Sequence, residues 1–393
     1  MKNDMTPETS LNKWDRLPST NSEREKIWTK NRTFSQDVWY RFSHKPTALV
    51  GLIMIILLLI FAFIGPLFSS YDYSQQNLEL ANISPILHVC KNPMGDNFIY
   101  ITRNLKLIEV DENGHLIRQL KKRGEDAKKS VTLFKYDDKN KIQLSTAVMP
   151  AAVLDKDGNR LMADKVLWNH SYILGTDNLG RDIFTRLMFG TRISMIVAFI
   201  AAAVNMIIGT LYGSISGYIG GTVDVIMMRI VDIINTIPLT LYVILIQVFL
   251  GSGLKSIIIA LSSVYWVDMA RVVRGQVLSV KQQEYVMAAH TIGSSSRYVI
   301  LRHLVPNSMG SILVTVTMLI PSAIFMEAFM SFIGIGISPP MASLGTMCND
   351  AVEALRTSPY QLLMPAIMIC LIMFSFNFVG DGLRDALDPK LKK

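Results

Sequence analysis

Residues 281–306 read KQQEYVMAAHTIGSSSRYVILRHLVP, a polar and basic stretch between two long apolar runs, and this contrast indicates how the chain is organised. A short amphipathic helix is predicted at its start by four residues at helical spacing, Tyr285, Ala288, Ala289 and Ile292. Gly293 can end this helix in a left-handed cap. The stretch therefore lies outside the lipid, between two membrane spans.

The second half of this stretch predicts another short helix. Three serines at 294–296 can cap it, and Val299, Ile300 and Leu304 give it an apolar face. Pro306 suits the first turn of the span that follows. We therefore expect two small helices lying across one membrane face, and we call residues 281–306 the knob.

The composition indicates a membrane protein. Half of the 393 residues are apolar and 18% are charged, whereas about a quarter of a soluble domain is charged. The net charge of +8 could indicate nucleic-acid binding. The basic residues gather between apolar runs, however, which favours the positive-inside bias of a membrane protein. The first apolar run starts too late and is too long for a cleavable signal peptide.

Hydropathy and charge predict an all-α polytopic membrane protein with six transmembrane helices and an inserted extracytoplasmic β-rich domain. Residues 1–45 form a basic cytoplasmic tail, either mostly unstructured or with an amphipathic turn resting on the membrane surface. Residues 46–70 form the first span, 71–172 the insertion, and 173–393 a five-helix core that contains the knob. The core spans are expected at 193–223, 225–250, 252–273, 307–335 and 359–379. Six crossings place both termini and the knob in the cytoplasm.

The insertion is rich in charge and contains two hairpin signals. Asp-Glu-Asn-Gly at 111–114 and Asp-Lys-Asp-Gly at 155–158 each lie between apolar runs, as in tight turns between antiparallel strands. We expect a small β-rich domain outside the membrane. Its role is either that of a stabilising lid or that of a docking surface for a substrate-delivery protein.

Two glycine patterns have structural interpretations. Residues 175–182, GTDNLGRD, read as a tight polar elbow, because they offer too few regularly spaced oxygen ligands for a Ca²⁺ loop. Gly209, Gly213 and Gly217 recur every four residues, a spacing that lets two helix backbones approach closely in lipid.

Ionisable side chains inside spans are candidates for the substrate pathway, because each costs about 3 kcal/mol on insertion scales. Amide side chains inside spans are milder cases. Asp232 lies three residues from Arg229, and Asp268 lies three residues before Arg271, so these carboxylates are expected to be paired. Glu327 has no basic neighbour at helical spacing. The predicted pathway residues are Glu327, Gln247 and Asn205.

Catalytic, metal and nucleotide sites are not predicted. Cys90, Cys348 and Cys370 lack the spacing of a metal or redox motif, and a Cys90–Cys348 bridge is the alternative to three free thiols. The stretch LGSGLKS at 250–256 lacks the Gly-x4-Gly-Lys-Ser/Thr spacing of a phosphate loop. We therefore expect no cofactor in this chain and an energy source in a partner.

The knob also resembles a known motif. Its Ala288-Ala289 pair, Gly293 and Leu-Val-Pro end at 304–306 are similar to the EAA loop of ATP-binding-cassette importer permeases. Five further blocks resemble the dipeptide and oligopeptide subfamily, so that the resemblance covers residues 174–393: GTDNLGRD (175–182), MRIVDIINTIP (228–238), WVDMARVVRGQ (266–276), SFIGIGISPP (331–340) and FVGDGLRDALDP (378–389). The chain departs from the family at Met287, where a glutamate is usual. Glu284, one helical turn earlier, is its possible substitute.

The resemblance implies the second permease subunit of a type I peptide importer in the cell membrane, which is a transport subunit and not an enzyme. It implies a homologous second permease, two cytoplasmic ATPase subunits that bind ATP and Mg²⁺, and an extracellular solute-binding lipoprotein. The knob would dock into a cleft of the ATPase through Glu284, Tyr285, Met287, Ala288, Ala289, Ile292, Gly293, Arg297, Arg302, His303 and Pro306. The alternatives are another cargo, such as nickel chelates, murein peptides or signalling peptides, and a membrane-anchored sensor or enzyme that acts through the outer domain.

Overall fold

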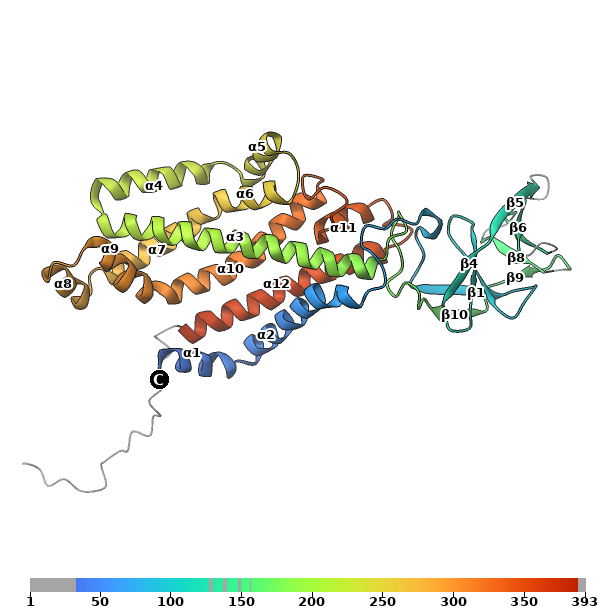
Figure 1. Cartoon of the computed structure of the whole chain (residues 1–393), viewed down its shortest axis with the longest axis horizontal. Coiled ribbons are helices and arrows are strands. Elements are labelled where there is room, and N and C mark those ends of the chain that lie inside the picture. Colours follow the sequence, from blue (N-terminus) through green and yellow to red (C-terminus); the bar gives the residue numbers. More distant parts are fainter. Residues whose placement is uncertain (1–32, 127–129, 137–139, 148–149, 156, 388–393) are drawn as a thin grey trace, which may run out of the picture.

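The computed structural model describes residues 33–126, 130–136, 140–147, 150–155 and 157–387. It has a long helical body with a β-rich module at one end (Figure 1). The knob lies at the opposite end, which also holds the first helix and the C-terminal end of the described chain. Most of the basic residues predicted to hold the two termini inside lie at 1–32 and 388–393, outside the described residues.

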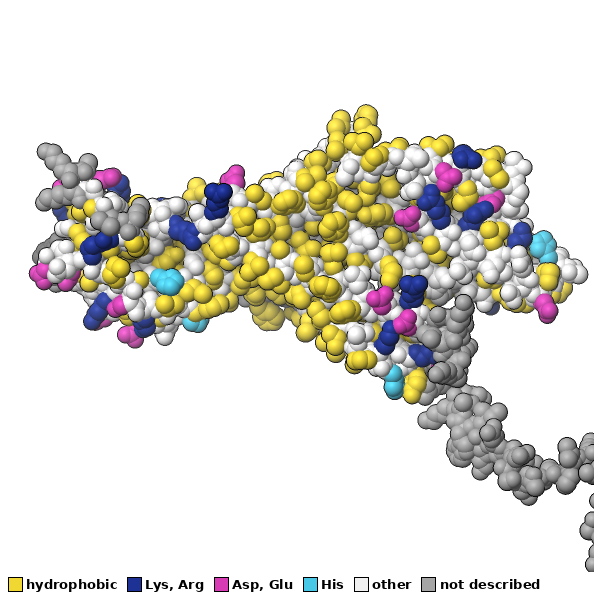
Figure 2. Space-filling model, turned by 180° about the vertical axis from the view of Figure 1, so that it is seen from behind, with side chains coloured by type: hydrophobic (Ala, Val, Ile, Leu, Met, Phe, Trp, Pro, Cys, Tyr) yellow, Lys and Arg dark blue, Asp and Glu magenta, His cyan; other side chains and the backbone are white. Residues whose placement is uncertain are grey.

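The described helices are α1 (Phe34–Ser43), α2 (Pro46–Leu59), α3 (Ile183–Ile219), α4 (Gly221–Thr236), α5 (Leu239–Leu250), α6 (Leu254–Val264), α7 (Trp266–Val280), α8 (Glu284–Thr291), α9 (Ser296–Val299), α10 (Val305–Phe332), α11 (Leu344–Ala351) and α12 (Tyr360–Leu387). Five continuous helical stretches are long and apolar enough to cross a membrane: Pro46–Phe68, Ile183–Ile219, Leu254–Val280, Ser296–Phe332 and Tyr360–Leu387. On the face shown in Figure 2, a belt of hydrophobic side chains covers the middle of the body, and most charged side chains lie toward its two ends.

The span predicted over 225–250, with Pro238 inside it, consists of two helices. α4 and α5 meet at 85°. Pro238 is the N-cap of α5, and the proline ring disfavours helical geometry at the residue before it, so Ile237 adopts extended backbone. The described chain has five candidate spans, or six if this bent pair counts as one.

The close approach of two helix backbones that the glycine spacing in α3 predicts is confirmed. A side chain at Gly213 would come within 2.3 Å of the carbonyl oxygen of Ala270, and one at Gly209 within 2.8 Å of that of Trp266. Both partners lie in α7. The backbones of α3 and α7 therefore pack at a distance that only glycine allows at these positions.

The module contains two five-stranded antiparallel sheets, with strand orders β10-β1-β2-β3-β4 and β5-β6-β7-β8-β9. The strands are β1 (Ile86–Lys91), β2 (Phe98–Ile101), β3 (Leu107–Val110), β4 (Leu116–Gln119), β5 (Lys121–Asp126), β6 (Val131–Lys135), β7 (Lys141–Ser145), β8 (Ala152–Leu154), β9 (Arg160–Leu161) and β10 (Lys165–Trp168). Both hairpin predictions are confirmed, because β3 pairs with β4 across 111–114 and β8 pairs with β9 across 155–158.

A buried carboxylate is held inside the module. Glu109, which is 3% exposed, accepts hydrogen bonds from Asn97 Nδ2 at 2.9 Å, Arg118 Nε at 2.7 Å and the Tyr136 hydroxyl at 3.1 Å. Burial alone would raise the pKa of Glu109, but these three donors outweigh it and lower the pKa below its usual value.

The predicted polar elbow joins the module to α3. The backbone amides of Leu179 and Arg181 each donate to Asp177 Oδ1 at 2.9 Å. Gly180 has φ +73°, and a side chain there would meet the Asn77 carbonyl oxygen at 1.8 Å, so the turn requires glycine. The segment just before β1, which contains Asn82, is bonded to α12, because Gln361 Nε2 donates to Asn82 Oδ1 at 2.8 Å.

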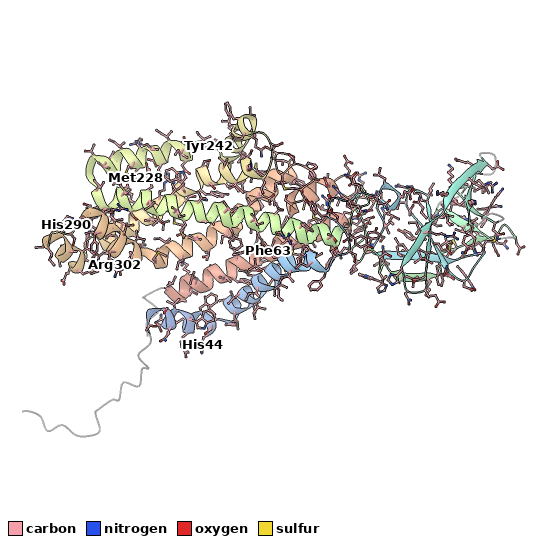
Figure 3. The ribbon with its side chains drawn as sticks, viewed as in Figure 1. His44, Phe63, Met228, Tyr242, His290 and Arg302 are labelled. Atoms are coloured by element: carbon pink, nitrogen blue, oxygen red, sulfur yellow. The ribbon has the colours of Figure 1, made fainter. Side chains whose placement is uncertain are left out.

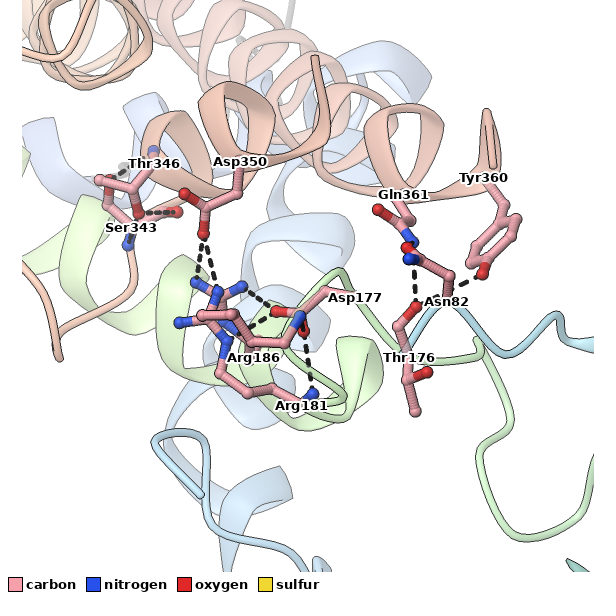
Figure 4. Close-up of polar contacts among 11 residues, drawn as sticks. Asn82, Thr176, Asp177, Arg181, Arg186, Ser343, Thr346, Asp350, Tyr360 and Gln361 are labelled. Atoms are coloured by element: carbon pink, nitrogen blue, oxygen red, sulfur yellow. Dashed lines mark hydrogen bonds and ion pairs between the residues drawn. The ribbon is translucent and has the colours of Figure 1, made fainter. Parts of the chain in front are cut away.

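Four buried or half-buried charges lock this elbow (Figure 4). Arg181 and Arg186 each contact both Asp177 and Asp350, at distances between 2.5 and 3.1 Å. Asp350 lies on α11, which occupies part of the outer loop predicted after the fifth span. The network therefore connects the start of α3 to the loop beyond α10.

Candidate functional site

The knob begins with α8 and turns at Gly293 as predicted. Gly293 has φ +85°, and the amide of Ser294 donates to the carbonyl oxygen of Ala289 at 3.1 Å, which closes a left-handed helix cap. Ser295 then caps α9, because its Oγ accepts from the amide of Tyr298 at 3.3 Å.

The second knob helix is not separate from the next span, which corrects the prediction of two isolated short helices. α9 continues through a π turn at Ile300–Leu304 into α10, so Ser296–Phe332 forms one helical stretch. A proline ring clashes with the carbonyl four residues earlier in a regular helix. The π turn just before Pro306, together with the place of Pro306 in the first turn of α10, lets the helix continue.

The knob presents an apolar face with basic residues beside it. Tyr285, Met287, Ile292, Tyr298 and Leu301 are exposed, and Ile292 reaches 85% exposure. Five large apolar side chains in so short a segment form an unusual surface for a monomer and mark a contact site. Figure 3 labels His290 and Arg302 in this knob, at the end of the body far from the module.

In the second knob helix the apolar face predicted at Val299 and Leu304 is turned toward the body, whereas in α8 the inward residue is Val286, which the sequence analysis did not single out. Val286, Val299 and Leu304 are buried and pack with Val273 and Val277 of α7. The helical stripe containing Tyr285 and Ile292 is the exposed one. Among the predicted docking residues, Ala289 and His303 are half-buried, and the others are exposed: Glu284, Tyr285, Met287, Ala288, Ile292, Gly293, Arg297, Arg302 and Pro306.

A side-chain contact that sequence reasoning missed attaches the knob to α3. The hydroxyl of Tyr218 and Nε2 of His290 share a hydrogen bond of 2.8 Å. Lys281 donates to the carbonyl oxygen of Tyr218, and its Nζ lies 5.4 Å from the centre of the Tyr218 ring. The sequence gives no signal for this contact, because the two paired residues are 72 positions apart.

The pairing predicted for two carboxylates in the spans is confirmed. Asp232 lies 4.0 Å from Arg229, and Asp268 lies 3.9 Å from Arg271. Arg271 also reaches across from α7 to Asp232 in α4, at 3.1 Å. These exposed pairs tie α4 to the body and contribute less than about 1 kcal/mol each.

A stronger ion pair, also missed from the sequence, lies further along the same two helices. Arg274 in α7 donates to both oxygens of Asp224 in α4, at 2.6 and 2.5 Å, and Ser216 in α3 donates to the same carboxylate. This bidentate contact fixes the ends of three helices next to the knob.

Glu327, the first predicted pathway residue, is fully buried between helices. Its carboxylate accepts from Ser194 Oγ of α3 at 2.6 Å and from Ser331 Oγ at 2.8 Å. Ser194 also accepts from the amide of Leu344 at the start of α11. The carboxylate can face a pathway only if α3 and α10 separate, so its pathway role stays a prediction.

The two amides predicted for the pathway have different surroundings. Gln247 in α5 donates from Nε2 to the carbonyl oxygen of Ile335 at 3.0 Å. Asn205 in α3 is fully buried, and neither of its side-chain polar atoms has a hydrogen-bond partner among the described residues. The pathway roles of both amides also stay predictions.

Within the described ranges, no group of three or more His, Cys, Asp or Glu side chains is placed to hold a metal ion. Cys90, Cys348 and Cys370 are all free thiols, so the alternative of a Cys90–Cys348 bridge is wrong.

Comparison with known proteins points to one family. Residues 209–393 match the family described as binding-protein-dependent transport system inner membrane component, and residues 33–85 match the N-terminal transmembrane domain of oligopeptide transport permease C. The chain is 40% identical over 371 residues to the oligopeptide transport system permease protein OppC of Bacillus subtilis, covering 94% of each chain. It is 49% identical over 220 residues to the dipeptide transport system permease protein DppC of the same organism, covering 56% of this chain and 69% of that one.

Proposed function

Because the chain belongs to the family of binding-protein-dependent transport system inner membrane components, we propose that it is a permease subunit of an ATP-driven importer of oligopeptides or dipeptides. The single observation that carries this function beyond the family match is the knob's exposed apolar and basic face. It lies at one end of the body, beyond the hydrophobic belt and opposite the module (Figure 2).

The partners follow from membership in this family. An importer of this kind contains a second permease and ATPase subunits, and ATP hydrolysis takes place in the ATPase subunits. An extracellular solute-binding lipoprotein completes the proposed assembly and delivers the peptide. ATP and Mg²⁺ bind to the partners, and this chain holds no cofactor of its own.

The proposed topology has six crossings, with the bent α4–α5 pair counted as one. Both termini and the knob then lie in the cytoplasm, and the module lies outside. The basic residues at 1–45 and after Asp381 support this orientation through the positive-inside rule.

The proposed mechanism couples the ATPase to the spans through the knob. When ATP brings the two ATPase subunits together, the knob moves with its docking cleft, and the helices attached to it move between inward-open and outward-open arrangements. A ligand shifts such an equilibrium only by its differential affinity for the two states, so nucleotide must favour one of them. Separation of α3 from α10 would expose Glu327, which could then meet the amino terminus of a peptide.

The module is proposed to be shared with some relatives and to serve delivery of the peptide. The match to Bacillus subtilis OppC covers 94% of this chain and therefore includes most of residues 71–172. The match to DppC covers 56% of it. Deletion of 71–172 should lower uptake from the binding protein if the module is a docking surface, and should lower only stability if it is a lid.

The test is uptake of labelled peptides of graded length into liposomes that contain the complex purified with its natural neighbours. Gly293→Trp should abolish uptake, because a bulky residue at φ +85° reshapes the docking surface. Gly275→Trp is the matched control, since Gly275 is an exposed glycine of α7 with nothing within 4 Å of its added side chain. The proposal is wrong if no ATPase accompanies the chain or if Gly293→Trp imports like the wild type.

A further inference from the structure

The contact between Tyr218 of α3 and His290 of the knob is the strongest feature that the proposed function does not yet use. Tyr218 lies in the last turn of α3 and is 6% exposed. Its hydroxyl is hydrogen-bonded to His290 of α8 at 2.8 Å, and the two rings stack with centroids 5.9 Å apart and planes 18° apart. Tyr218 is buried and His290 is exposed, so the hydrogen bond between them is half-buried.

The covalent connections of α8 do not lead to α3. The chain enters α8 from α7 through residues 281–283 and leaves it through the turn at 292–295. In that turn, a side chain added at Gly293 would meet nothing within 4 Å, so the turn itself is not packed against the body. Among the described residues, the Tyr218–His290 contact is the hydrogen bond that joins an α8 side chain to a membrane-spanning helix.

The helix end that receives this contact is firmly fixed. A side chain at Gly217 would come within 3.0 Å of the Arg274 carbonyl oxygen, so α3 and α7 are in close backbone contact there. Asp224 of α4 accepts from both Ser216 and Arg274. The ends of α3, α4 and α7 therefore form one block. α8 contacts its α7 part through Val286 and its α3 part through the hydrogen bond of His290 to Tyr218.

We propose that Tyr218 and His290 are positioning residues for coupling, a role that rests on the proposed function of the knob. The pair holds α8 at a fixed angle to the block of α3, α4 and α7. A displacement of α8 by the ATPase subunit then moves α3 instead of bending the Gly293 turn. Without the pair, part of the displacement of α8 by the ATPase subunit bends the Gly293 turn and does not move α3. ATP is then hydrolysed without transport.

The variants separate this role from packing. Tyr218→Phe removes one hydroxyl but keeps the ring, its stacking on His290 and its contact with Lys281. Tyr212→Phe is the matched control, because Tyr212 also lies on α3 and its hydroxyl donates to the carbonyl oxygen of Met227 in α4, at 2.8 Å. His290→Gln keeps an amide that can bond to the Tyr218 hydroxyl, whereas His290→Ala does not.

The experiment measures ATP hydrolysis and uptake of labelled tri-alanine by the full complex in liposomes. Tyr218→Phe and His290→Ala should raise the ATP consumed per peptide about five-fold or more, the lower end of usual coupling effects. Tyr212→Phe and His290→Gln should keep the wild-type ratio. The double variant Tyr218→Phe/His290→Ala should be no worse than the worse single variant, because both remove the same contact.

The outcomes are distinct. An unchanged ratio in Tyr218→Phe overturns the inference, including the case in which hydrolysis and uptake fall together, since that result indicates a structural role. An equal rise in Tyr212→Phe also overturns it. If the wild-type chain recruits no ATPase or imports no peptide, the proposed function itself fails, whatever the variants do.

Discussion

Removing the carboxylate of Asp177 should destabilise the elbow much more than removing that of Asp350. The side chain of Asp177 is 7% exposed, and those of Arg181 and Arg186 are 7% and 3% exposed, whereas that of Asp350 is 37% exposed. Asp177→Asn leaves two buried guanidinium groups facing one partly solvated carboxylate. Removing one partner of a buried ion pair costs about 3–5 kcal/mol. Asp350→Asn removes a carboxylate that water already reaches, which should cost about 1 kcal/mol.

The assay is hydrogen exchange of the elbow amides in the intact complex. The amide of Asn82, which donates to the Asp177 carbonyl oxygen at 2.9 Å, and that of Arg181 report opening of the turn. Asp177→Asn should speed their exchange about 100-fold or more, and Asp350→Asn about five-fold, by the free energies above. Amides within β1 and β2 serve as the internal control, because their bonds lie inside the sheet.

The reasoning is refuted if Asp350→Asn opens the elbow as much as Asp177→Asn does. That result would mean that burial does not set the cost of losing a charge here. Equal acceleration in β1 and β2 would mean that the module unfolds as a whole, and the elbow would then not be a local unit.

Three further outcomes are expected. Gly293→Ala should speed hydrogen exchange of the amides at the α8 cap about five-fold or more, because an L-residue in left-handed conformation costs about 1–2 kcal/mol. Gly275→Ala, in the regular helix α7, should instead slow exchange of the neighbouring amides. One hydrogen-exchange experiment on the two variants measures both effects. Glu109 has a lowered pKa in the folded module, so its stabilising effect is fully present above its unfolded pKa near 4.5 and is lost as pH falls through the folded pKa. Glu109→Gln should remove this part of the acid sensitivity, which the melting temperature of the full chain at a series of pH values measures. Gly213→Leu should prevent stable assembly, because its side chain would overlap the backbone of α7, and size-exclusion chromatography of the complex would detect this.

Features set by neighbouring residues were predictable from the sequence. The turn at 111–114 needs only an Asn-Gly pair between two strands, and the cap at Gly293 needs only a glycine after a helical stripe. The stripe of Gly209, Gly213 and Gly217 lies on one helix face whatever packs against it. In each case the residue type restricts the backbone within a few positions.

Features set by helix faces far apart in the sequence were not predictable. Arg274 and Asp224 are 50 positions apart, and hydropathy does not say which face of α7 meets α4. The knob shows the same limit, because two apolar stripes run along α8 at helical spacing. Only packing decides that Val286 lies inside and Tyr285 outside. The bend at Pro238 was visible as a proline, but membrane helices also accommodate proline, as α10 does at Pro321.

The length of α3 explains how charged contacts can lie at both of its ends. Its 37 residues extend about 55 Å at 1.5 Å per residue, whereas the hydrocarbon core of a bilayer is about 30 Å thick. For a helix that crosses along the membrane normal, about 25 Å of this length lies outside the hydrocarbon, and tilt reduces that surplus. This surplus accommodates the ion network of Arg186 at one end and the contacts of Ser216 and Tyr218 at the other. A helix just long enough to span would bury one of these polar clusters in lipid, at a cost of several kcal/mol. The same continuous helix thus contacts both the elbow and the knob, so a displacement at its knob end reaches the elbow without crossing a flexible loop.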